Sequence, residues 1–379
     1  MILNNQRNLF DIPADVAYLN CAYMSPLLRT SIKTTHSSFQ RKARPWNITP
    51  EDFFSDTETT RRLAAKIVGC SSNDIALVPS ASYGIAIAER NLLATEGQEI
   101  LVLDEQYPSN LYAWREMSSR TGARLRTIPR PHDGNWTPEI LRWITAETAL
   151  AALPHCHWKD GSLVDLEIIS ELLRKHGASL VVDATQSLGA MPLNLERVQP
   201  DFLVAACYKW LLGPYSTGIL YVAPQHQEGQ PLEFNSHNRA GSEDFTKLVR
   251  YRDDYQEGAR RFDVGERSNF ALLPPLIDGL KQILDWGIDS IYATIGEITH
   301  RLAEEVERAG LIVDNPAYRA NHFLGIRFPG DTPIDLTDHL AKHNIYVSRR
   351  GNSVRVTPHV YNTNDDIERL LKFLGPYLS

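Results

Sequence analysis

The chain of 379 residues lacks a long apolar run, an excess of positive charge and any paired cysteine motif. A transmembrane helix needs about 20 consecutive apolar residues, so we expect no membrane span. Lys and Arg number 39 against 46 Asp and Glu, a net charge of −7, which argues against a nucleic-acid-binding protein. The opening stretch MILNNQRNLFDIP lacks the charged and then apolar pattern of a signal peptide. We therefore expect a cytoplasmic protein.

Cysteine is scarce, and its spacing excludes two common uses. The four cysteines are Cys21, Cys70, Cys156 and Cys207. Without a C-x-x-C pair they form neither a disulfide framework nor a zinc knuckle. The run His155-Cys156-His157 resembles a ligand set, but neighbours in a strand point to opposite faces and cannot converge on one ion. We predict no metal site.

Short apolar runs alternate with helical patterns from about residue 75 onward. The predicted strands are residues 75–79, 99–103, 125–129, 148–154, 179–184, 201–206 and 217–223. Continuous apolar strands separated by helices are typical of a mostly parallel sheet covered on both faces. Such sheets bind ligands at the carboxyl ends of their strands.

After about residue 270 the pattern changes to that of a smaller α+β domain. The expected elements are helices over 272–287 and 288–309, short strands near 323–328 and 346–350, and a closing helix over 365–378. A chain of this length exceeds what one core usually organises. We therefore predict an N-terminal arm (residues 1–20), a large domain (21–270) and a small C-terminal domain (271–379).

Lys209 stands in an otherwise apolar setting, with Cys207, Tyr208 and Trp210 beside it. Burial disfavours the ammonium form of a lysine. One explanation is a strand-end lysine whose stem packs on apolar surface while its head reaches water. The alternative is a nucleophile toward a carbonyl group, as in Schiff-base lysines.

Two other strand ends carry polar residues. Asp183 ends a buried strand and either caps the next turn or binds a ligand. Ser82 stands where strand 75–79 leads into a helix, so it is either part of a helix cap or a phosphate ligand. Pyridoxal 5′-phosphate explains Lys209, Asp183 and Ser82 together, because it needs a lysine for its aldehyde, a carboxylate for its ring nitrogen and a helix N-terminus for its phosphate.

Five motifs, in this order along the chain, carry a family resemblance: YLNCAYMSPL, DEQYPSN, VVDATQSLGAMPLNLERVQPDFLVAACYKWLLGPYSTGILYV, RFDVGERSN and RVTPHVYNT. With them the chain resembles the class V aminotransferase-like enzymes, a fold-type I pyridoxal-phosphate family. That family includes cysteine desulfurases, C–S lyases and penicillin N epimerases. The resemblance implies an α/β fold, with a large cofactor-binding domain around a mostly parallel sheet and a smaller α+β domain.

The resemblance also implies roles for individual residues. Lys209 would form the Schiff base with the cofactor and later move the substrate's α-proton. Asp183 would pair with the pyridinium nitrogen, and Gln186 would bond the phenolic oxygen of the ring. Ser82 and the backbone amide of Ala81 would hold the phosphate.

Other matches concern the ring, the substrate and the second subunit. Tyr107 would stack on the cofactor, unless it is only an aromatic residue opening a helix, and Tyr208 takes a place where relatives often carry histidine. Arg355 would bind the substrate's α-carboxylate through its guanidinium fork. Ser268 or Arg267 would reach the cofactor phosphate of a partner subunit, which implies a homodimer.

The sequence departs from the family pattern at several positions. Relatives often have a serine where Ala206 and Cys207 stand, and an asparagine where Trp158 stands. Cysteine desulfurases of this family carry a catalytic cysteine on the loop before the carboxylate-binding arginine, but residues 348–360 contain none. The one other candidate for a catalytic cysteine is Cys21, which lies in a segment that borders the pocket in relatives. Desulfuration through a persulfide is therefore disfavoured.

The predicted function is that of a pyridoxal-phosphate enzyme acting at the α-carbon of an amino acid. We favour β-elimination, as in C–S lyases, without a catalytic cysteine. An aminotransferase or an amino-acid epimerase would use the same residues, so both stay open. A non-catalytic cofactor-binding sensor would need an appended module that the sequence does not show. A nicotinamide dehydrogenase would need a G-x-G-x-x-G turn, which VPSASYG does not supply.

Overall fold

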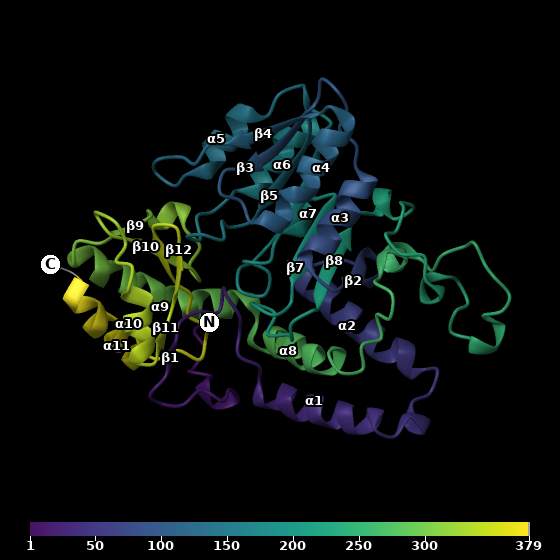
Figure 1. Cartoon of the computed structure of the whole chain (residues 1–379), viewed down its shortest axis with the longest axis horizontal. Helices are drawn as coiled ribbons and strands as arrows, with labels where there is room; N and C mark the ends of the chain where they lie inside the picture. Colours follow the sequence, from purple (N-terminus) through teal and green to yellow (C-terminus); the bar gives the residue numbers. More distant parts are fainter. Residues whose placement is uncertain (378–379) are drawn as a thin grey trace.

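The protein, described by a computed structural model over residues 1–377, has a large seven-stranded sheet, a separate four-stranded sheet and a short two-stranded pair. Figure 1 shows the large sheet with its helices in the upper part of the view and the four-stranded sheet with its helices at the left. The N-terminal segment runs between these two parts. The predicted α/β class is confirmed.

The large sheet has the strand order β2-β8-β7-β6-β5-β3-β4. Its strands are β2 (Ile75–Val78), β3 (Glu99–Leu103), β4 (Arg124–Ile128), β5 (Thr148–Pro154), β6 (Ser179–Asp183), β7 (Phe202–Ala206) and β8 (Gly218–Val222). Strands β7, β6, β5, β3 and β4 are mutually parallel, and β8 is antiparallel to both of its neighbours. Each strand agrees with its predicted range to within one residue at either end.

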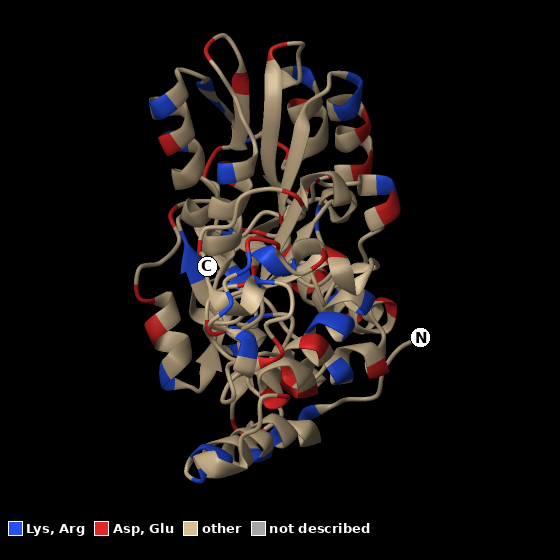
Figure 2. Ribbon diagram, turned by 90° about the vertical axis from the view of Figure 1, so that its right-hand side faces the viewer, with Lys and Arg blue, Asp and Glu red and all other residues tan. Residues whose placement is uncertain are grey.

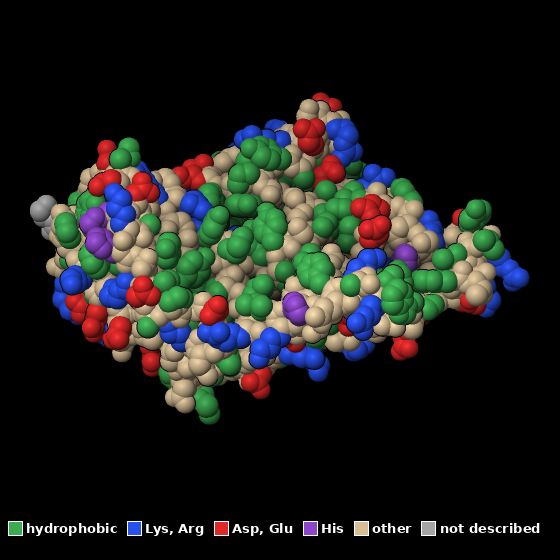
Figure 3. Space-filling model, turned by 60° about the horizontal axis from the view of Figure 1, so that its bottom comes forward, with side chains coloured by type: hydrophobic (Ala, Val, Ile, Leu, Met, Phe, Trp, Pro, Cys, Tyr) green, Lys and Arg blue, Asp and Glu red, His purple; other side chains and the backbone are tan. Residues whose placement is uncertain are grey.

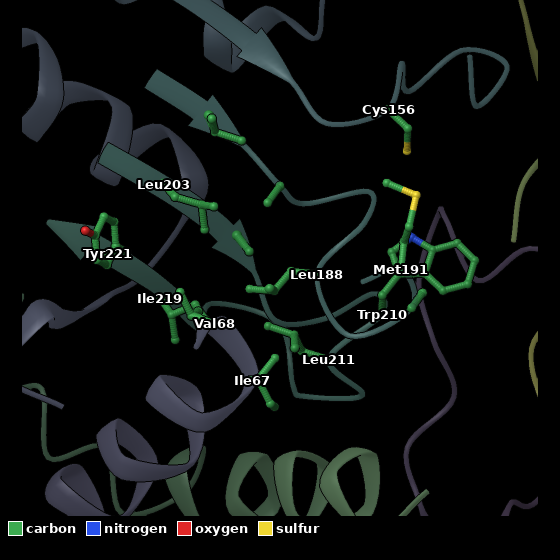
Figure 4. Close-up of a cluster of buried hydrophobic side chains, with 14 of the residues drawn as sticks. Ile67, Val68, Cys156, Leu188, Met191, Leu203, Trp210, Leu211, Ile219 and Tyr221 are labelled. Atoms are coloured by element: carbon green, nitrogen blue, oxygen red, sulfur yellow. The ribbon is translucent and has the colours of Figure 1, made fainter. Parts of the chain in front are cut away.

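Helices cover both faces of this sheet, as the continuous apolar strands predict. The helices of the large domain are α1 (Arg29–Lys42), α2 (Asp52–Val68), α3 (Ala81–Asn91), α4 (Tyr112–Thr121), α5 (Trp136–Trp143), α6 (Leu166–Lys175) and α7 (Leu195–Val198). One face packs on α3 and α4, and the other on α2, α5, α6 and the later helix α8 (Leu273–Trp286). Figure 4 shows the second core where Leu203, Ile219 and Tyr221 of the sheet face Ile67 and Val68 of α2.

The C-terminal part is the predicted α+β domain. Its elements are α8 (Leu273–Trp286), α9 (Ile288–Arg308), β9 (Ile312–Val313), β10 (Leu324–Arg327), α10 (Leu336–Lys342), β11 (Ile345–Tyr346), β12 (Ser348–Arg350), β13 (Ser353–Val356) and α11 (Asn364–Leu374). The antiparallel order β12-β13-β10-β9 forms the small sheet. Its core is continuous with the inner faces of α9 and α11.

Two segments connect the domains. Strand β1 (Ala17–Tyr18) of the predicted N-terminal arm pairs in parallel with β11 of the small domain. Helix α8, which the predicted boundary assigns to the small domain, packs on α1 and α2 under the large sheet. The closing helix ends at Leu374 and continues as a 3-10 turn to Tyr377, whereas the predicted end near Leu378 lies outside the described residues.

No helix within residues 1–377 is both long enough and apolar enough to cross a membrane. In the side view of Figure 2, Lys and Arg are interspersed with Asp and Glu over most of the ribbon.

A buried ion network fixes the segment after residue 258 against the edge of the large sheet. Arg61 of α2 and Asp263 are both fully buried and form two hydrogen bonds, of 3.1 and 2.7 Å. Asp263 also accepts the backbone N–H of Leu77 at 2.8 Å, and its carboxylate lies 3.1 Å from Nε of Arg267. One carboxylate therefore compensates two buried guanidinium groups, with help from the partly exposed Glu58.

We predict that Asp263→Ala lowers the free energy of unfolding by about 3–5 kcal/mol, because it leaves buried arginines without a counter-charge. Urea denaturation followed by tryptophan fluorescence measures the change. The control is Glu304→Ala, which removes one partner of the exposed pair Glu304–Arg308 and should leave the unfolding curve in place. Equal curves for the two variants would mean that the network does not stabilise the fold.

Candidate active site

The predicted site residues lie where parallel strands end at one edge of the large sheet. Asp183 is the last residue of β6, and Lys209 follows the end of the adjacent strand β7. Tyr107 follows β3, Trp158 follows β5, and Ser82 lies in the first turn of α3 after β2. Because these strands point the same way, residues distant in the sequence meet at one edge.

Lys209 and Asp183 are both withdrawn from water, with exposed fractions of 6% and 8%. Burial lowers the pKa of Lys209 to about 8, although the nearby Asp183 carboxylate opposes the shift and the Arg355 guanidinium adds to it. About one Lys209 in ten is therefore neutral at pH 7, against fewer than about one in a thousand for an ordinary lysine. Burial also raises the pKa of Asp183. An amine with this pKa can act as a nucleophile and as a proton carrier near neutral pH.

A narrow slot beside Lys209 is lined by Asp183, Thr185 and Gln186 from the segment after β6. The Oδ1 atom of Asp183 accepts the backbone N–H of Thr185 at 3.0 Å, and no hydrogen bond from residues 1–377 engages Oδ2. The slot therefore presents a carboxylate oxygen that can accept a hydrogen bond from the N–H of a ring nitrogen.

Gln186 lines the same slot, with its side chain held by hydrogen bonds on two sides. Its Nε2 donates to the carbonyl of Ala22 at 3.2 Å, and its Oε1 accepts the indole N–H of Trp210 at 3.1 Å. Gln186 lines the slot, and its amide has a second N–H besides the one bonded to Ala22. The glycine at 189 has a φ of +94°, and a Cβ there would lie 2.6 Å from the Trp210 carbonyl oxygen, so only glycine lets the turn after Gln186 pack under Trp210.

A second cavity, of about 180 Å³, lies between the N-terminus of α3 and Lys209. Ser80 is the N-cap of α3, its Oγ accepting the backbone N–H of Tyr83 at 3.2 Å and lying 2.9 Å from Oγ of Ser82. Free amides of a first helical turn together with hydroxyl groups are suited to an anion. Five lining residues with hydroxyl groups were not predicted: Ser109, Thr185, Tyr215, Ser216 and Thr217.

Aromatic rings flank Lys209. Its Nζ lies 5.5 Å from the ring centre of Tyr107 and 5.4 Å from that of Tyr208. Tyr107 meets the ring of Trp158 edge to face at 5.5 Å, and the indole N–H of Trp158 donates to the Glu105 carbonyl at 2.7 Å. The loop with Tyr107 and the loop with Trp158 are therefore joined into one wall of the site.

Arg355 is a buried guanidinium without an acidic partner among the described residues. It is 1% exposed, donates to the Trp158 carbonyl at 2.9 Å and to Ser348 Oγ at 3.1 Å, and leaves its Nε without a partner. Burial, assisted by the charge of Arg350, lowers its pKa to about 9, so it remains cationic at neutral pH. A buried cation in this state favours an anionic ligand.

The three neighbouring arginines of the small sheet are distinguished by their surroundings. Arg350 lines the same pocket as Arg355 and Lys209, with its guanidinium 5.9 Å from the ring centre of Trp158. Arg349 donates to the carbonyls of Gly351 and Pro333, away from this pocket. The alternation of side chains along a strand could have separated neighbours, but the sequence does not reveal which face is inward.

Ser268 and Arg267 do not join the other site residues within one chain. Ser268 is 9% exposed and donates to the carbonyl of Phe53, and Arg267 is 2% exposed with its guanidinium 5.5 Å from the ring centre of Phe54. Their predicted contact with a partner subunit stays a prediction.

All four cysteines are free thiols, and three are buried. Cys156 lines the slot itself, its Sγ 3.3 Å from the carbonyl oxygen of Gln186, and the Sγ of Cys21 lies 4.0 Å from the carbonyl oxygen of Lys209. Burial raises the pKa of both thiols well above the ordinary value, which disfavours the reactive thiolate. Within residues 1–377 no group of three or more His, Cys, Asp or Glu side chains is arranged to hold a metal ion.

His322 of the small domain is a further residue that the sequence did not reveal. Its Nε2 lies 2.6 Å from the Gln186 carbonyl oxygen, and its ring meets that of Trp210 edge to face at 4.6 Å. No local motif marks this residue, because its partners lie more than a hundred positions earlier in the chain.

Comparisons with known proteins place these features in a family. The family model described as aminotransferase class-V matches residues 43–370. An uncharacterised aminotransferase, YcbU, of Bacillus subtilis is 26% identical over 357 residues, covering 92% of this chain and 90% of its own length. A probable cysteine desulfurase of Pyrococcus abyssi is 25% identical over 337 residues, covering 84% and 82%.

Solved structures agree in fold over nearly the whole chain. The cysteine desulfurase of Thermococcus onnurineus has a TM-score of 0.84 at 20% identity and covers 100% of this chain and 99% of its own. The cystine C–S lyase C-DES, in complex with its product cysteine persulfide, has a TM-score of 0.85 at 19% identity and covers 95% and 97%. With most of its length matched by the family model, the chain belongs to the class V aminotransferase family, whose members are pyridoxal-phosphate-dependent enzymes.

Proposed function

We propose that this protein binds pyridoxal 5′-phosphate at the carboxyl edge of the large sheet and acts on the α-carbon of an amino acid, by β-elimination from a sulfur-containing substrate. One observation carries the proposal: a buried lysine of lowered pKa lies beside a buried carboxylate, and an unpaired buried guanidinium faces the same pocket. These three groups suit an aldehyde, a ring nitrogen and an α-carboxylate.

The residues fit the cofactor in further respects. The cavity at the start of α3 offers Ala81 and Ser82 to a phosphate, and the slot offers Oδ2 of Asp183 and an N–H of Gln186 to a ring. Bound there, the cofactor supplies an aldehyde and a protonated ring that withdraws electrons from the substrate's α-carbon. Tyr107 provides an aromatic ring against which a planar group can stack.

Three side chains of the protein then have separate roles. Arg355 holds the α-carboxylate and so orients the α-hydrogen, and Asp183 keeps a proton on the ring nitrogen by presenting a negative charge to it. Lys209 removes the α-proton and holds it, which its pKa of about 8 allows near neutral pH. Loss of the β-substituent as a thiolate would be elimination. Protonation of the opposite face of the α-carbon would be epimerisation, and delivery of the proton to the aldehyde carbon of the cofactor would be transamination.

A mechanism without a catalytic cysteine is supported by the hairpin before Arg355. Strands β12 and β13 pair Arg350 with Ser353, so that only Gly351 and Asn352 form the turn between them. A two-residue turn leaves no loop on which a thiol could approach Lys209. The relatives described as cysteine desulfurases and the C–S lyase favour sulfur-containing substrates, and the hairpin favours elimination over transfer to a thiol.

We also infer that the enzyme is a homodimer whose second subunit completes the phosphate site through the Ser268 loop. Large apolar side chains stand exposed in the single chain, with exposed fractions of 61% for Phe39, 78% for Trp46 and 96% for Tyr251. Figure 3 shows hydrophobic side chains gathered over the face that carries α1. Exposed apolar patches of this kind are typical of subunit interfaces. The cytoplasmic location stays a prediction.

The proposed function is tested by incubating the purified protein with pyridoxal phosphate and screening amino acids for pyruvate, ammonia, keto acid and racemised product. We expect a visible absorption band and pyruvate with ammonia from at least one sulfur-containing amino acid. Lys209→Ala should lose both the band and turnover, whereas Lys66→Ala, on the exposed side of α2, should keep them. A spectral change without any product would identify a sensor and contradict the enzymatic proposal.

We predict that Asp183→Ala slows α-proton removal by at least about a hundredfold, since a preorganised charge at the reacting centre is typically worth that much. Exchange of the α-hydrogen with deuterium from D₂O, followed by NMR on the cofactor-loaded variant, measures this step directly. The urea unfolding curve should shift little in comparison. Exchange at the wild-type rate would mean that Asp183 has only a structural role, in the turn where it accepts the backbone N–H of Thr185.

We predict that Arg355→Lys raises KM about thirtyfold or more and leaves the visible spectrum of the bound cofactor unchanged. Loss of a bidentate contact to a charged group costs about 2–5 kcal/mol of binding free energy when the partner stays buried. Arg349→Lys is the matched control, because Arg349 bonds backbone carbonyls away from the pocket. An unchanged KM for Arg355→Lys would indicate that Arg350, and not Arg355, binds the substrate's α-carboxylate.

A further inference from the structure

The space that a substrate's side chain would occupy is a cavity of about 410 Å³ on the solvent side of Lys209. This volume is within the range of about 300–1,000 Å³ found for sites of small organic ligands. Six large side chains form most of the wall: Tyr23, Met24, Tyr107, Trp158, Tyr208 and Tyr215. With the α-carboxylate on Arg355 and the α-hydrogen at Lys209, the side chain has to extend into this cavity.

The rings of the wall form two pairs, and one ring centre of each pair lies within 5.5 Å of the Nζ atom of Lys209. Tyr107 and Trp158 meet at 5.5 Å with an interplanar angle of 76°, and Tyr208 and Tyr215 meet at 4.7 Å with an angle of 54°. In the single chain, 63% of Tyr215 is exposed. Aromatic surface standing in water at the rim of a pocket gains free energy when a flat apolar group covers it.

The charged residues of the cavity restrict which substrate side chains it can bind. No Asp or Glu is among its ten lining residues, and the cations besides Lys209 are Arg350 and Arg355. A cationic side chain would therefore be repelled. Arg350 already lies against the ring of Trp158 at 5.9 Å and donates to the Arg349 carbonyl at 2.7 Å. A short polar side chain would leave the ring faces uncovered.

We propose that the substrate is an α-amino acid whose β-carbon carries, through a thioether sulfur, a large, flat and uncharged group, aromatic or heteroaromatic. This inference rests on the proposed function, because it takes Arg355 as the site of the α-carboxylate. Tyr23 and Met24 line this cavity but neither the slot nor the phosphate cavity. They are therefore specificity-determining residues that act on the side chain alone.

The test is a titration of the cofactor-loaded holoenzyme with L-phenylalanine, L-alanine, L-aspartate and L-lysine, with the shift of the visible band as the measure of binding. We expect Kd for phenylalanine to be about tenfold or more below that for alanine, the scale on which apolar pockets discriminate. Tyr23→Ala should remove most of this advantage and leave Kd for alanine unchanged. The matched control is Tyr112→Ala on α4, an exposed tyrosine outside the cavity, which should change neither value.

Each contrary result has a separate meaning. Equal affinity for phenylalanine and alanine overturns the proposal. An equal loss of affinity for both amino acids in Tyr23→Ala overturns it as well. If aspartate binds most tightly of the four amino acids, the proposal is also overturned. The substrate side chain would then be an anion bound by Arg350. If the band is present but no amino acid shifts it, the carboxylate site on Arg355 is wrong, and the proposed function fails together with this inference.

Discussion

The withdrawal of an amine and a carboxylate from water at the ends of two neighbouring strands is the constraint on which the site depends. Strands β6 and β7 are adjacent and parallel, so Asp183 and the segment carrying Lys209 leave the sheet at the same edge. Burial pulls each group toward its neutral form, whereas their mutual attraction favours the charged forms. The balance gives Lys209 a pKa of about 8. An isolated lysine at this depth would be a weaker proton carrier, and an exposed one a poor nucleophile.

The wall behind Lys209 has to be both rigid and uncharged for this balance to hold. Trp210 is fixed by its bond to Gln186, and His322 of the small domain lies on both of them. Burial lowers the pKa of His322 to about 4 and that of His359 to about 3, so both imidazoles are neutral at neutral pH. Both rings contact Trp210, which follows Lys209 in the chain, and a cationic ring there would depress the pKa of the amine further. Packing between the two domains therefore protects the electrostatics of the site.

Much of this arrangement could be predicted from the sequence, because buried strands that end on polar residues are a local signal. Asp183, Ser82 and Lys209 were found in this way, and the strand ranges followed from the same apolar runs. Which of Arg349, Arg350 and Arg355 face the pocket, and the bond between Arg355 and Trp158, could not be predicted. Both depend on how the small sheet faces residues nearly two hundred positions earlier. Exposed apolar side chains in one chain do not show which residues meet across a subunit boundary, so the role given to the Ser268 loop stays a prediction.

Charge balance at the phosphate cavity connects cofactor binding to assembly. Lys209 is the one cationic side chain among the residues that line this cavity. A phosphate ester carries about −1.5 to −2 charges at pH 7, whereas a helix N-terminus offers the equivalent of about +0.5. Once Lys209 is committed to the aldehyde, the hydroxyls of Ser82 and its neighbours have to hold the remaining charge without a cation. A second subunit that brings donors across the boundary would remove this deficit. In the proposed dimer the cofactor would then bind the pair more tightly than the single chain. By mass action, cofactor binding would stabilise the dimer, and dimerisation would stabilise the loaded site.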